Sequence, residues 1–525
     1  MHKTIDEFLL KADQCDLCII GSGPAGIAVV SKLLKSDLKV VLLESGLKDT
    51  SLVHQELNYG RSSGPRELNL SASRLRVFGG AGKLWAGVCR PLGKDEFNRR
   101  DSDSLWQWPL NYRELEPYYE ESAKLLNIDY GAFFSDSWVH DAELAQQFPE
   151  LAPSGSLLRG LAFEQSSPSA RDLTNKFGSQ IIASSNVTLV TDATACDIRA
   201  TKFSNNSSKV AEILIRSMSG VERKLYSGCT VVAAGALENP RILKTSSLPK
   251  NVKGSDFLGG CFMSHPGFSE VGYLHVNDEI RCFDENKIKR FLQNKTKRKY
   301  FVFEAATRER RRLKILRHSI SLKPLDNARA INKSYIFNSK SKNKTIMDNL
   351  KLFEVFKNVG CALKGRTAVP GLWAIGVGIE QEPRLTNKVK LLNQSDQFGI
   401  PKIDVFWDNI GQLEKKTILE SVKILGRQAT SSRTGIVQLS ERMLDGSIFN
   451  QQDPINHHIG TTRMASRSDL GIVDKDLKVF GIENLYITGS SVFPTSSIVN
   501  PTFTIIALSL RLGEKLLSLS SSFRD

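Results

Sequence analysis

The feature that most constrains the fold of this chain is a glycine motif near its N-terminus, Gly21-x-Gly23-x-x-Gly26. An apolar run at residues 16–20 precedes it and apolar residues at helical spacing follow it, so we expect a strand, a turn and a helix in that order. The first glycine permits a tight turn, the second lets a pyrophosphate approach the backbone, and the third lets the helix pack closely on the strand. The motif therefore predicts a dinucleotide-binding site.

An acidic residue after the next strand supports this prediction. A second apolar run, residues 39–43, ends on Glu44, where a carboxylate can accept a hydrogen bond from an adenosine ribose hydroxyl. An acid at this position disfavours the 2′-phosphate of NADP. A plain glycine turn is the alternative interpretation, and the strand, helix and acid around the motif weigh against it. The motif by itself does not separate NAD from FAD.

Two later segments have a similar strand, turn and helix pattern. A buried strand is expected at 228–234 with a helix after it near Pro240, and a short strand at 484–488 is followed by a loop and an apolar helix that begins at Pro501. Proline fits the first turn of a helix because its missing N–H is not needed there. A long stretch of different character, 263–450, lies between these two segments. The patterns predict a nucleotide-binding domain assembled from separated pieces, with a substrate domain inserted.

Several stretches of the chain resemble the glucose-methanol-choline (GMC) oxidoreductase family, whose members are FAD enzymes that act on alcohols and sugars. Residues 76–87 resemble the glycine-rich loop that passes beside the flavin, and residues 232–243 are similar to the second signature of the nucleotide domain. The strongest match is the C-terminal block 457–510. Shorter matches lie at 260–266, which resembles the family's Met-x-His-Pro segment, and at 380–383. Together these segments span nearly the whole chain in the family's order.

The resemblance implies an α/β fold, with a Rossmann-like FAD-binding domain assembled from separated segments and an inserted α+β substrate domain that contains an antiparallel sheet. Residues 1–105, 170–262 and 451–525 are then expected to form the FAD-binding domain. Residues 106–169 and 263–450 are expected to form the substrate-binding domain.

FAD is the cofactor that the resemblance implies. Members that attach FAD covalently through the glycine-rich loop carry a histidine where Leu84 stands, so non-covalent binding is expected. Ala465, which replaces a glycine usual in the family, is too small a change to alter the assignment. The residues expected to contact FAD lie in glycine turns, at strand ends and beside the flavin: Gly21, Ser22, Gly23, Pro24, Ala25, Gly26, Glu44, Ser45, Arg76, Gly79, Gly80, Trp85, Ala86, Gly87, Ala195, Ala234, Gly235, Gly489, Ser490, Asn500, Pro501 and Thr502.

Two residues of the C-terminal block correspond to the family's active-site pair. His457 matches the catalytic histidine through its His-x-x-Gly spacing to Gly460, and an imidazole is suited to act as a base near neutral pH. Asn500 matches the second position, where either His or Asn occurs, and as Asn it would orient the substrate oxygen without taking up a proton. A structural histidine and an ordinary turn residue before proline are the respective alternatives. His458 and His265 are expected to be structural.

The substrate is less well defined by the sequence. Side chains alternate along a strand, so only one of Glu380 and Gln381 is expected to face the flavin, and which of the two does so stays open. The segments 85–87, 108–110 and 116–119 resemble the pyranose oxidase and bacterial sugar dehydrogenase side of the family. A small-molecule alcohol or sugar is therefore the expected substrate, with oxygen or another electron acceptor as the oxidant.

The expected reaction is hydride transfer from a CH–OH group to the flavin, with His457 as the base that removes the hydroxyl proton. The free N–H groups and the dipole of the helix that begins at Pro501 would stabilise negative charge on the reduced flavin. Two alternatives stay open: a lyase of the same fold that cleaves hydroxynitriles with the flavin in a structural role, and an FAD-binding protein without activity. The presence of both His457 and Asn500 weighs against a loss of activity. The sequence shows no iron–sulfur or haem motif.

Positive charge is concentrated in one segment of the chain. The formal net charge is +15, and residues 285–318 hold 13 Lys and Arg against 3 Glu. A solvated insertion is the simplest interpretation, and contact with a membrane surface or an acidic partner is the alternative. No nucleic-acid-binding motif accompanies the segment, so binding to nucleic acid is not expected.

The eight cysteines are too sparse for a disulfide framework. Cys15-x-x-Cys18 lies in an apolar strand without a second pair to complete a metal site, so core packing is expected rather than metal or redox chemistry. The N-terminus shows no basic stretch followed by an apolar run, and no segment is apolar over the ~18 residues that a membrane-spanning helix needs. A cytoplasmic protein is therefore expected.

Overall fold

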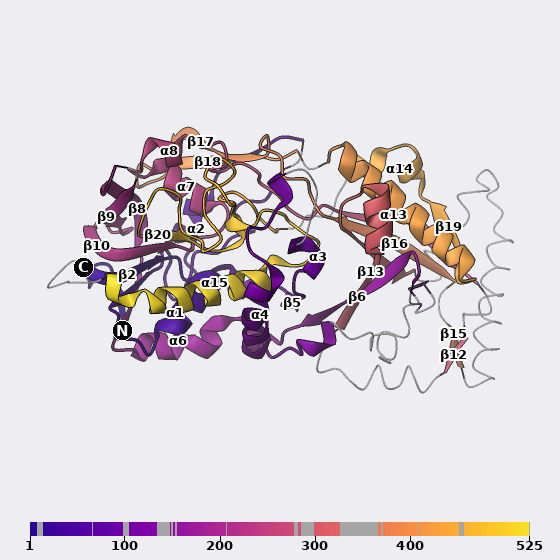
Figure 1. The fold of residues 1–525 in the computed structure, drawn as a ribbon, viewed down its shortest axis with the longest axis horizontal. Helices are drawn as coiled ribbons and strands as arrows, with labels where there is room; N and C mark the ends of the chain where they lie inside the picture. Colours follow the sequence, from indigo (N-terminus) through magenta and orange to yellow (C-terminus); the bar gives the residue numbers. More distant parts are fainter. Residues whose placement is uncertain are drawn as a thin grey trace.

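The computed structural model describes residues 1–7, 14–65, 67–97, 104–133, 148, 151–152, 155–205, 207–277, 282–284, 299–325, 366–368, 371–408, 410–450 and 456–523. Within them, the helices and strands form two groups that lie side by side along the longest axis of the molecule (Figure 1). Each group contains a large β-sheet and its own cluster of buried apolar side chains. The protein is thus a mixed α/β structure with several sheets, and the predicted fold class is confirmed at this level.

The first sheet has eight strands, and its central part is parallel. The strands that pair in parallel are, in spatial order, β1 (His2–Thr4), β7 (Val187–Thr191), β3 (Val40–Leu43), β2 (Gln14–Ile20), β10 (Glu222–Val232) and β20 (Leu485–Ile487). The beginning of β10 also pairs antiparallel with β9 (Ser208–Arg216), which pairs with β8 (Thr194–Lys202). Strand β3 is apolar and buried along its whole length, as expected for a parallel strand that is covered on both faces.

The glycine motif forms the predicted turn between β2 and α1 (Pro24–Leu33). Gly21 has a φ of +106°, in the left-handed region that side chains rarely adopt. A Cβ at Gly26 would lie 1.9 Å from the carbonyl oxygen of Gly21, so only glycine lets the helix begin directly against the end of the strand. The turn therefore requires glycine at positions 21 and 26, because any side chain there would strain the backbone or clash with it.

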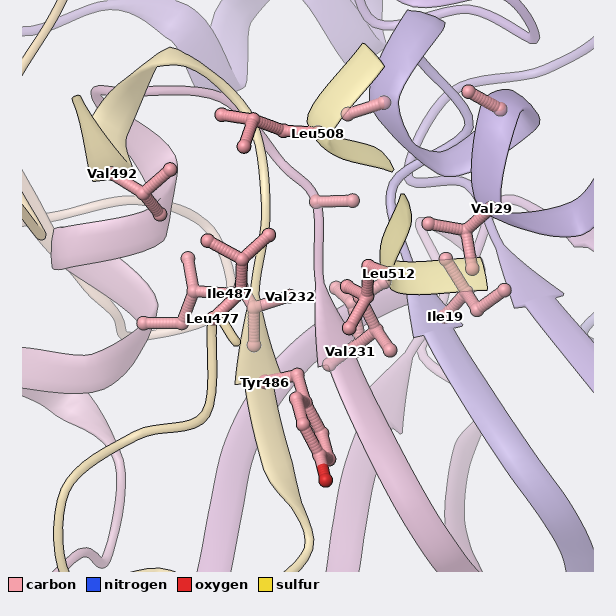
Figure 2. Packing of buried hydrophobic residues seen from close by; sticks show 14 of the residues in the cluster. Ile19, Val29, Val231, Val232, Leu477, Tyr486, Ile487, Val492, Leu508 and Leu512 are labelled. Atoms are coloured by element: carbon pink, nitrogen blue, oxygen red, sulfur yellow. The ribbon is translucent and has the colours of Figure 1, made fainter. Parts of the chain in front are cut away.

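The long C-terminal helix α15 (Pro501–Ser518) packs against α1. A Cβ at Gly513 would lie 2.9 Å from the carbonyl oxygen of Val29, so the two helices are in close backbone contact there. Figure 2 shows Leu512 of α15 near Val231 of β10, within the buried cluster that also contains Ile19 of β2. This packing ties the last helix of the chain to the first one.

The second sheet has seven strands, all antiparallel to their neighbours. They are, in spatial order, β19 (Gly435–Leu439), β11 (Gly267–Val276), β16 (Leu372–Ile379), β14 (His318–Pro324), β13 (Lys299–Ala305), β6 (Leu158–Gln165) and β5 (Val88–Cys89). Helix α13 (Gln412–Ser431) packs on this sheet and buries Ile418, Val422 and Leu425. Apart from β5, the strands come from the segments that the sequence assigns to the substrate-binding domain.

Two regions cross the division that the sequence predicts. Helix α4 (Tyr112–Leu126) packs on α15 and buries Leu115 and Tyr119 in the first cluster. A small sheet of β17 (Lys388–Ser395), β18 (Pro401–Phe406) and β4 (Arg61–Ser63) packs next to α7 (Glu238–Thr245). Both regions belong to the first group by their packing, and the domain boundaries stay a prediction.

The remaining described elements are mostly short. The helices are α2 (Leu52–Gln55), α3 (Lys94–Phe97), α5 (Pro168–Arg171), α6 (Leu173–Ala183), α8 (Lys250–Lys253), α10 (Thr307–Leu313) and α14 (Glu441–Leu444). Strands β12 (Cys282–Asp284) and β15 (Arg366–Ala368) form a two-stranded sheet. Of the basic segment 285–318, residues 285–298 lie outside the described residues, and α10 carries the exposed Arg308 and Arg312.

Cys15 and Cys18 lie on β2 and are buried and free, as are the other cysteines for which the structure describes side chains. Burial raises the pKa of the Cys15 thiol to about 12, so the thiol stays protonated and unreactive. In the described part of the chain, no group of three or more His, Cys, Asp or Glu residues could hold a metal ion. No described helix is both long enough and apolar enough to cross a membrane.

Gly26→Ala is expected to destabilise the fold. The added Cβ would meet the Gly21 carbonyl oxygen at 1.9 Å, so β2 and α1 must move apart, at a cost of about 1–3 kcal/mol or more. Gly23→Ala is the matched control, because nothing lies within 4 Å of a Cβ there, and it should cost no more than about 1 kcal/mol. The apparent midpoint of urea unfolding of the apoprotein, followed by circular dichroism, measures both effects without the contribution of bound FAD. Equal midpoints for the two variants would contradict the close contact at Gly26.

Candidate active site

A cavity of about 400 Å³ lies at the carboxyl ends of the parallel strands. Its walls include Ile20 and Leu43, the last residues of β2 and β3, and Ala233, which follows β10. Gly489, two residues after β20, forms part of another wall. Ligands of open α/β sheets bind just beyond the carboxyl ends of the strands. The sheet thus puts this cavity where a nucleotide site is expected.

Most residues that the sequence assigns to FAD line this cavity. They are Gly21, Ser22, Gly23, Pro24, Ala25, Glu44, Ser45, Arg76, Gly80, Trp85, Ala86, Ala195, Ala234, Gly235, Gly489, Ser490, Asn500, Pro501 and Thr502. Gly26, Gly79 and Gly87 are not part of the lining. The Gly79 N–H donates to the carbonyl oxygen of Ser22 at 3.2 Å, which holds the loop 76–87 against the glycine turn.

Glu44 is held in place by donors to both of its carboxylate oxygens. The backbone N–H of Gly46 donates to Oε1 at 2.8 Å, and the hydroxyl of Ser22 donates to Oε2 at 2.5 Å. Burial raises the pKa of this carboxyl, while the donors from Ser22 and Gly46 oppose the shift. Each carboxylate oxygen has two lone pairs, so Glu44 can still accept a hydrogen bond from a ligand hydroxyl.

The start of α1 fits a pyrophosphate. Its N-cap residue, Gly23, has no side chain to accept from the first N–H groups of the helix. A Cβ at Gly23 would meet nothing within 4 Å, and the same holds for Gly235 and Gly489 on other walls of the cavity. Open N–H groups at a helix N-terminus bind anionic phosphates. The residues therefore fit a dinucleotide whose pyrophosphate lies over Gly23.

His457 lines the same cavity, and backbone pairing sets its position. Met263 and Ile459 exchange backbone hydrogen bonds of 3.0 and 3.1 Å. This bridge joins the two segments, and His265 and His457 each lie two residues from it. The two Nδ1 atoms lie 2.9 Å apart. His265, for which the sequence suggested only a structural role, thus contacts the predicted base.

The environment of His457 favours its neutral form. Burial lowers the pKa of His457 well below its usual range, and His265 and His458 add to this effect. Among the described residues, no hydrogen bond uses Nε2 of His457, so this nitrogen is available to a ligand. His458 also lines the cavity, and burial together with Arg74 lowers its pKa to about 3. Its ring packs on Phe262 at a centroid distance of 5.9 Å.

Asn500 is the N-cap residue of α15, but its side chain does not cap the helix. Within the described residues no hydrogen bond of this amide is seen, and Asn500 lines the cavity. Pro501 and Thr502, in the first turn of α15, line it too. The cavity therefore receives both an amide with hydrogen-bonding capacity and the positive end of a helix of 18 residues.

Glu380 and Gln381 do not line the cavity. Both follow β16 and are fully buried. The Oε1 atom of Gln381 accepts from the Ser264 N–H at 3.0 Å and from the Trp407 indole at 2.9 Å. The Oε1 atom of Glu380 accepts from the Ser497 N–H at 3.3 Å. These side chains hold neighbouring segments together, and that one of them faces the flavin stays a prediction.

The cavity wall also contains a charged cluster that the sequence analysis does not identify. Glu238 forms ion pairs with Arg74 at 2.5 Å and Arg76 at 3.1 Å. A third pair, with Arg241, is 3.2 Å long. Burial alone would raise the pKa of Glu238, but the three arginines together hold it well below its usual range. Arg74 and Glu238 are 164 positions apart, so no local pattern links them.

Comparisons with known proteins agree with this geometry. Residues 383–509 match a family model described as GMC oxidoreductase. A 2-methyl-1,2-propanediol dehydrogenase of Mycolicibacterium austroafricanum is 22% identical over 96% of this chain and 95% of its own length. The large subunit of fructose dehydrogenase of Gluconobacter japonicus is 21% identical over 96% of this chain and 98% of its own. The structure of pyridoxine 4-oxidase from Mesorbium loti has the same fold, with a TM-score of 0.52 at 15% identity over 95% of this chain and 99% of that chain.

The cavity thus combines the glycine turn and Glu44, which suit a dinucleotide, with a buried histidine whose pKa is lowered. The family model and the relatives of similar length both indicate the GMC oxidoreductase family. The predicted enzyme class, an FAD-dependent oxidoreductase of alcohols or sugars, is confirmed at this level. FAD is the cofactor expected in the cavity.

Gly23→Ala is expected to weaken FAD binding without unfolding the protein, because the methyl group would project to where the pyrophosphate approaches the backbone. We expect the Kd for FAD to rise at least about tenfold, which corresponds to about 1.4 kcal/mol. Titration of the apoprotein with FAD, followed by flavin fluorescence, measures it. Gly426→Ala in α13 is the control, since its Cβ would meet only Val437 at 3.5 Å. An unchanged Kd for the Gly23 variant would place the pyrophosphate elsewhere.

Proposed function

We propose that the protein oxidises a CH–OH group of a sugar, a glycoside or another alcohol to a carbonyl, with FAD as the hydride acceptor and His457 as the base. The observation that carries this proposal is that His457 and Asn500 line the same cavity as the glycine turn and Glu44. One space therefore contains the groups that suit a dinucleotide and a neutral imidazole with an available nitrogen.

The reaction removes the hydroxyl proton and the carbon-bound hydrogen from one substrate carbon and oxygen. FAD, when bound, supplies the acceptor for the hydride at its N5 atom. Nε2 of His457 takes the hydroxyl proton, and the ring becomes an imidazolium. The Asn500 amide donates a hydrogen bond to the substrate oxygen, which holds the hydroxyl at the base and stabilises the negative charge that develops on this oxygen.

Two further features support this arrangement. The N-terminus of α15, at Pro501 and Thr502, contributes a positive field to the cavity, and this field favours the extra negative charge of a reduced cofactor. Leu84 lines the cavity as well, and its side chain has no heteroatom that could bond to the flavin, so FAD is held non-covalently in this proposal. The two buried clusters support a division into an FAD-binding and a substrate-binding part.

The relatives support a substrate of this class. By their names, two of them are dehydrogenases of a diol and of fructose, and the structural neighbour is an oxidase of pyridoxine. Both kinds of electron acceptor, oxygen and another oxidant, are therefore represented among similar proteins. The proposal includes either one.

Anaerobic addition of the right alcohol or sugar is expected to bleach the visible absorbance of the bound flavin. A screen of sugars, glycosides, polyols and simple alcohols tests this, and admission of air afterwards separates an oxidase from a dehydrogenase. His457→Ala should retain FAD and reduce the rate of bleaching by about 10²- to 10⁴-fold. His275→Ala is a control, since His275 hydrogen-bonds Gln438 on β19 and does not line the cavity. Cleavage of a hydroxynitrile with no bleaching by any compound would overturn the proposal in favour of a lyase.

The pH dependence of the reaction should report the lowered pKa of His457. The base must be neutral, so activity is lost only when the pH falls through this pKa. Burial lowers the pKa of His457, and the acid limb of kcat/KM should therefore lie below the value of ~6.5 of an ordinary histidine. Stopped-flow measurement of flavin reduction across the acid and neutral range checks this. An acid limb above neutral pH would indicate a different base.

A further inference from the structure

We propose that His265 is a positioning residue that fixes the tautomer of His457, so that Nδ1 of His457 carries the proton and Nε2 presents its lone pair to the substrate. The inference rests on the proposed role of His457 as the base. It follows from a chain of two hydrogen bonds, in which the ring of His265 lies between the carbonyl of Ser496 and the ring of His457.

The first link sets the state of His265. Its Nε2 lies 2.7 Å from the carbonyl oxygen of Ser496, and a carbonyl oxygen only accepts hydrogen bonds, so Nε2 carries a proton. Burial lowers the pKa of His265 to about 4, so near neutral pH the ring holds one proton only. Nδ1 of His265 therefore has a lone pair and acts as an acceptor.

The second hydrogen bond, between His265 and His457, then fixes the tautomer of His457. Nδ1 of His457 lies 2.9 Å from Nδ1 of His265, which accepts, so Nδ1 of His457 must donate. A neutral imidazole has one N–H, and Nε2 of His457 is then unprotonated. The opposite tautomer of His457 would bring two lone pairs together at hydrogen-bond distance. The tautomer that a base needs is thus the one that the pair favours.

The Ser496 carbonyl is itself held by buried contacts. The hydroxyl oxygen of Ser496 accepts from the Gln381 N–H at 3.0 Å. Next to it, the Ser497 N–H donates to Glu380 at 3.3 Å and the Ser497 hydroxyl donates to Glu96 at 2.9 Å. Ser497 has a φ of +56°, which is uncommon for a residue with a side chain. Glu380 and Gln381 therefore act on the site indirectly, through the loop whose carbonyl orients His265.

His265 positions the base and does not carry the substrate proton. That proton binds to Nε2 of His457. Transfer onward would put a second proton on His265, whose pKa is about 4, and the Ser496 carbonyl beyond it cannot take a proton away. The proton therefore leaves from Nε2 of His457 through the cavity.

Two variants of His265 separate positioning from mere packing. In His265→Asn the amide oxygen can take the acceptor place of Nδ1, whereas His265→Leu has no acceptor. The Asn variant should keep the limiting rate of flavin reduction within about tenfold. The Leu variant should lose at least about tenfold, up to the ~10⁴-fold that a wrong histidine tautomer costs a serine protease. In the Leu variant KM should change little.

His318→Asn is the matched control. His318 is also fully buried, donates to the Leu316 carbonyl at 3.1 Å and accepts from the Ala305 N–H at 3.1 Å, but it does not line the cavity. It should lower the melting temperature without changing the rate of flavin reduction. A rate for His265→Leu equal to that of the wild type would overturn the proposal.

The tautomer can also be read directly by ¹⁵N NMR of the holoenzyme labelled at histidine, with the His457 signals identified by their loss in His457→Gln. We expect an unprotonated Nε2 in the wild type and in His265→Asn, and a mixture of tautomers in His265→Leu. A protonated Nε2 in the wild type would overturn the proposal even if the Leu variant failed to fold. Because the spectrum needs no turnover, it decides the tautomer even if no alcohol bleaches the flavin, which would contradict only the proposed reaction.

Discussion

The antiparallel pairing of Met263 with Ile459 is the contact on which the active site depends. It joins the chain just before β11 to the start of the C-terminal block and sets which side chains lie opposite one another. The next residue of this block is also held by a backbone hydrogen bond, because the Gly460 N–H donates to the carbonyl oxygen of Ser490 at 3.1 Å. The segment of His457 is therefore held by main-chain hydrogen bonds to two other parts of the chain.

The nucleotide side of the cavity depends on close backbone contact instead. Gly21 and Gly26 let α1 begin against the end of β2, and Gly513 lets α15 lie against α1. Because Asn500 is the N-cap residue of α15, the packing of the first helix on the last one brings this amide to the cavity that the glycine turn also lines. Two kinds of constraint thus shape one cavity. Glycines that allow close backbone contact form its nucleotide side, and main-chain hydrogen bonds hold the segment of His457.

Several parts of the site could be predicted because their signals are local. The glycine turn, the acid after β3 and the proline at the start of α15 each follow from a few neighbouring residues. The directions of Glu380 and Gln381 do not follow from a local pattern. Strand β16 ends at Ile379, so the alternation of side chains along a strand does not extend to them, and their hydrogen-bond partners decide their direction. The ion pairs of Glu238 and the contact between His265 and His457 join residues that are far apart in sequence, and no spacing reveals them.

The sequence by itself determined that a dinucleotide turn would form and that an imidazole and an amide would be available for chemistry. These are properties of residue types in short segments, and they hold wherever the rest of the chain goes. Only the tertiary structure decided which nitrogen of His457 would accept the proton in the proposed reaction. The tautomer of a histidine depends on its hydrogen-bond partner, and here the partner lies 192 positions away, in a segment that a backbone bridge joins to that of His457.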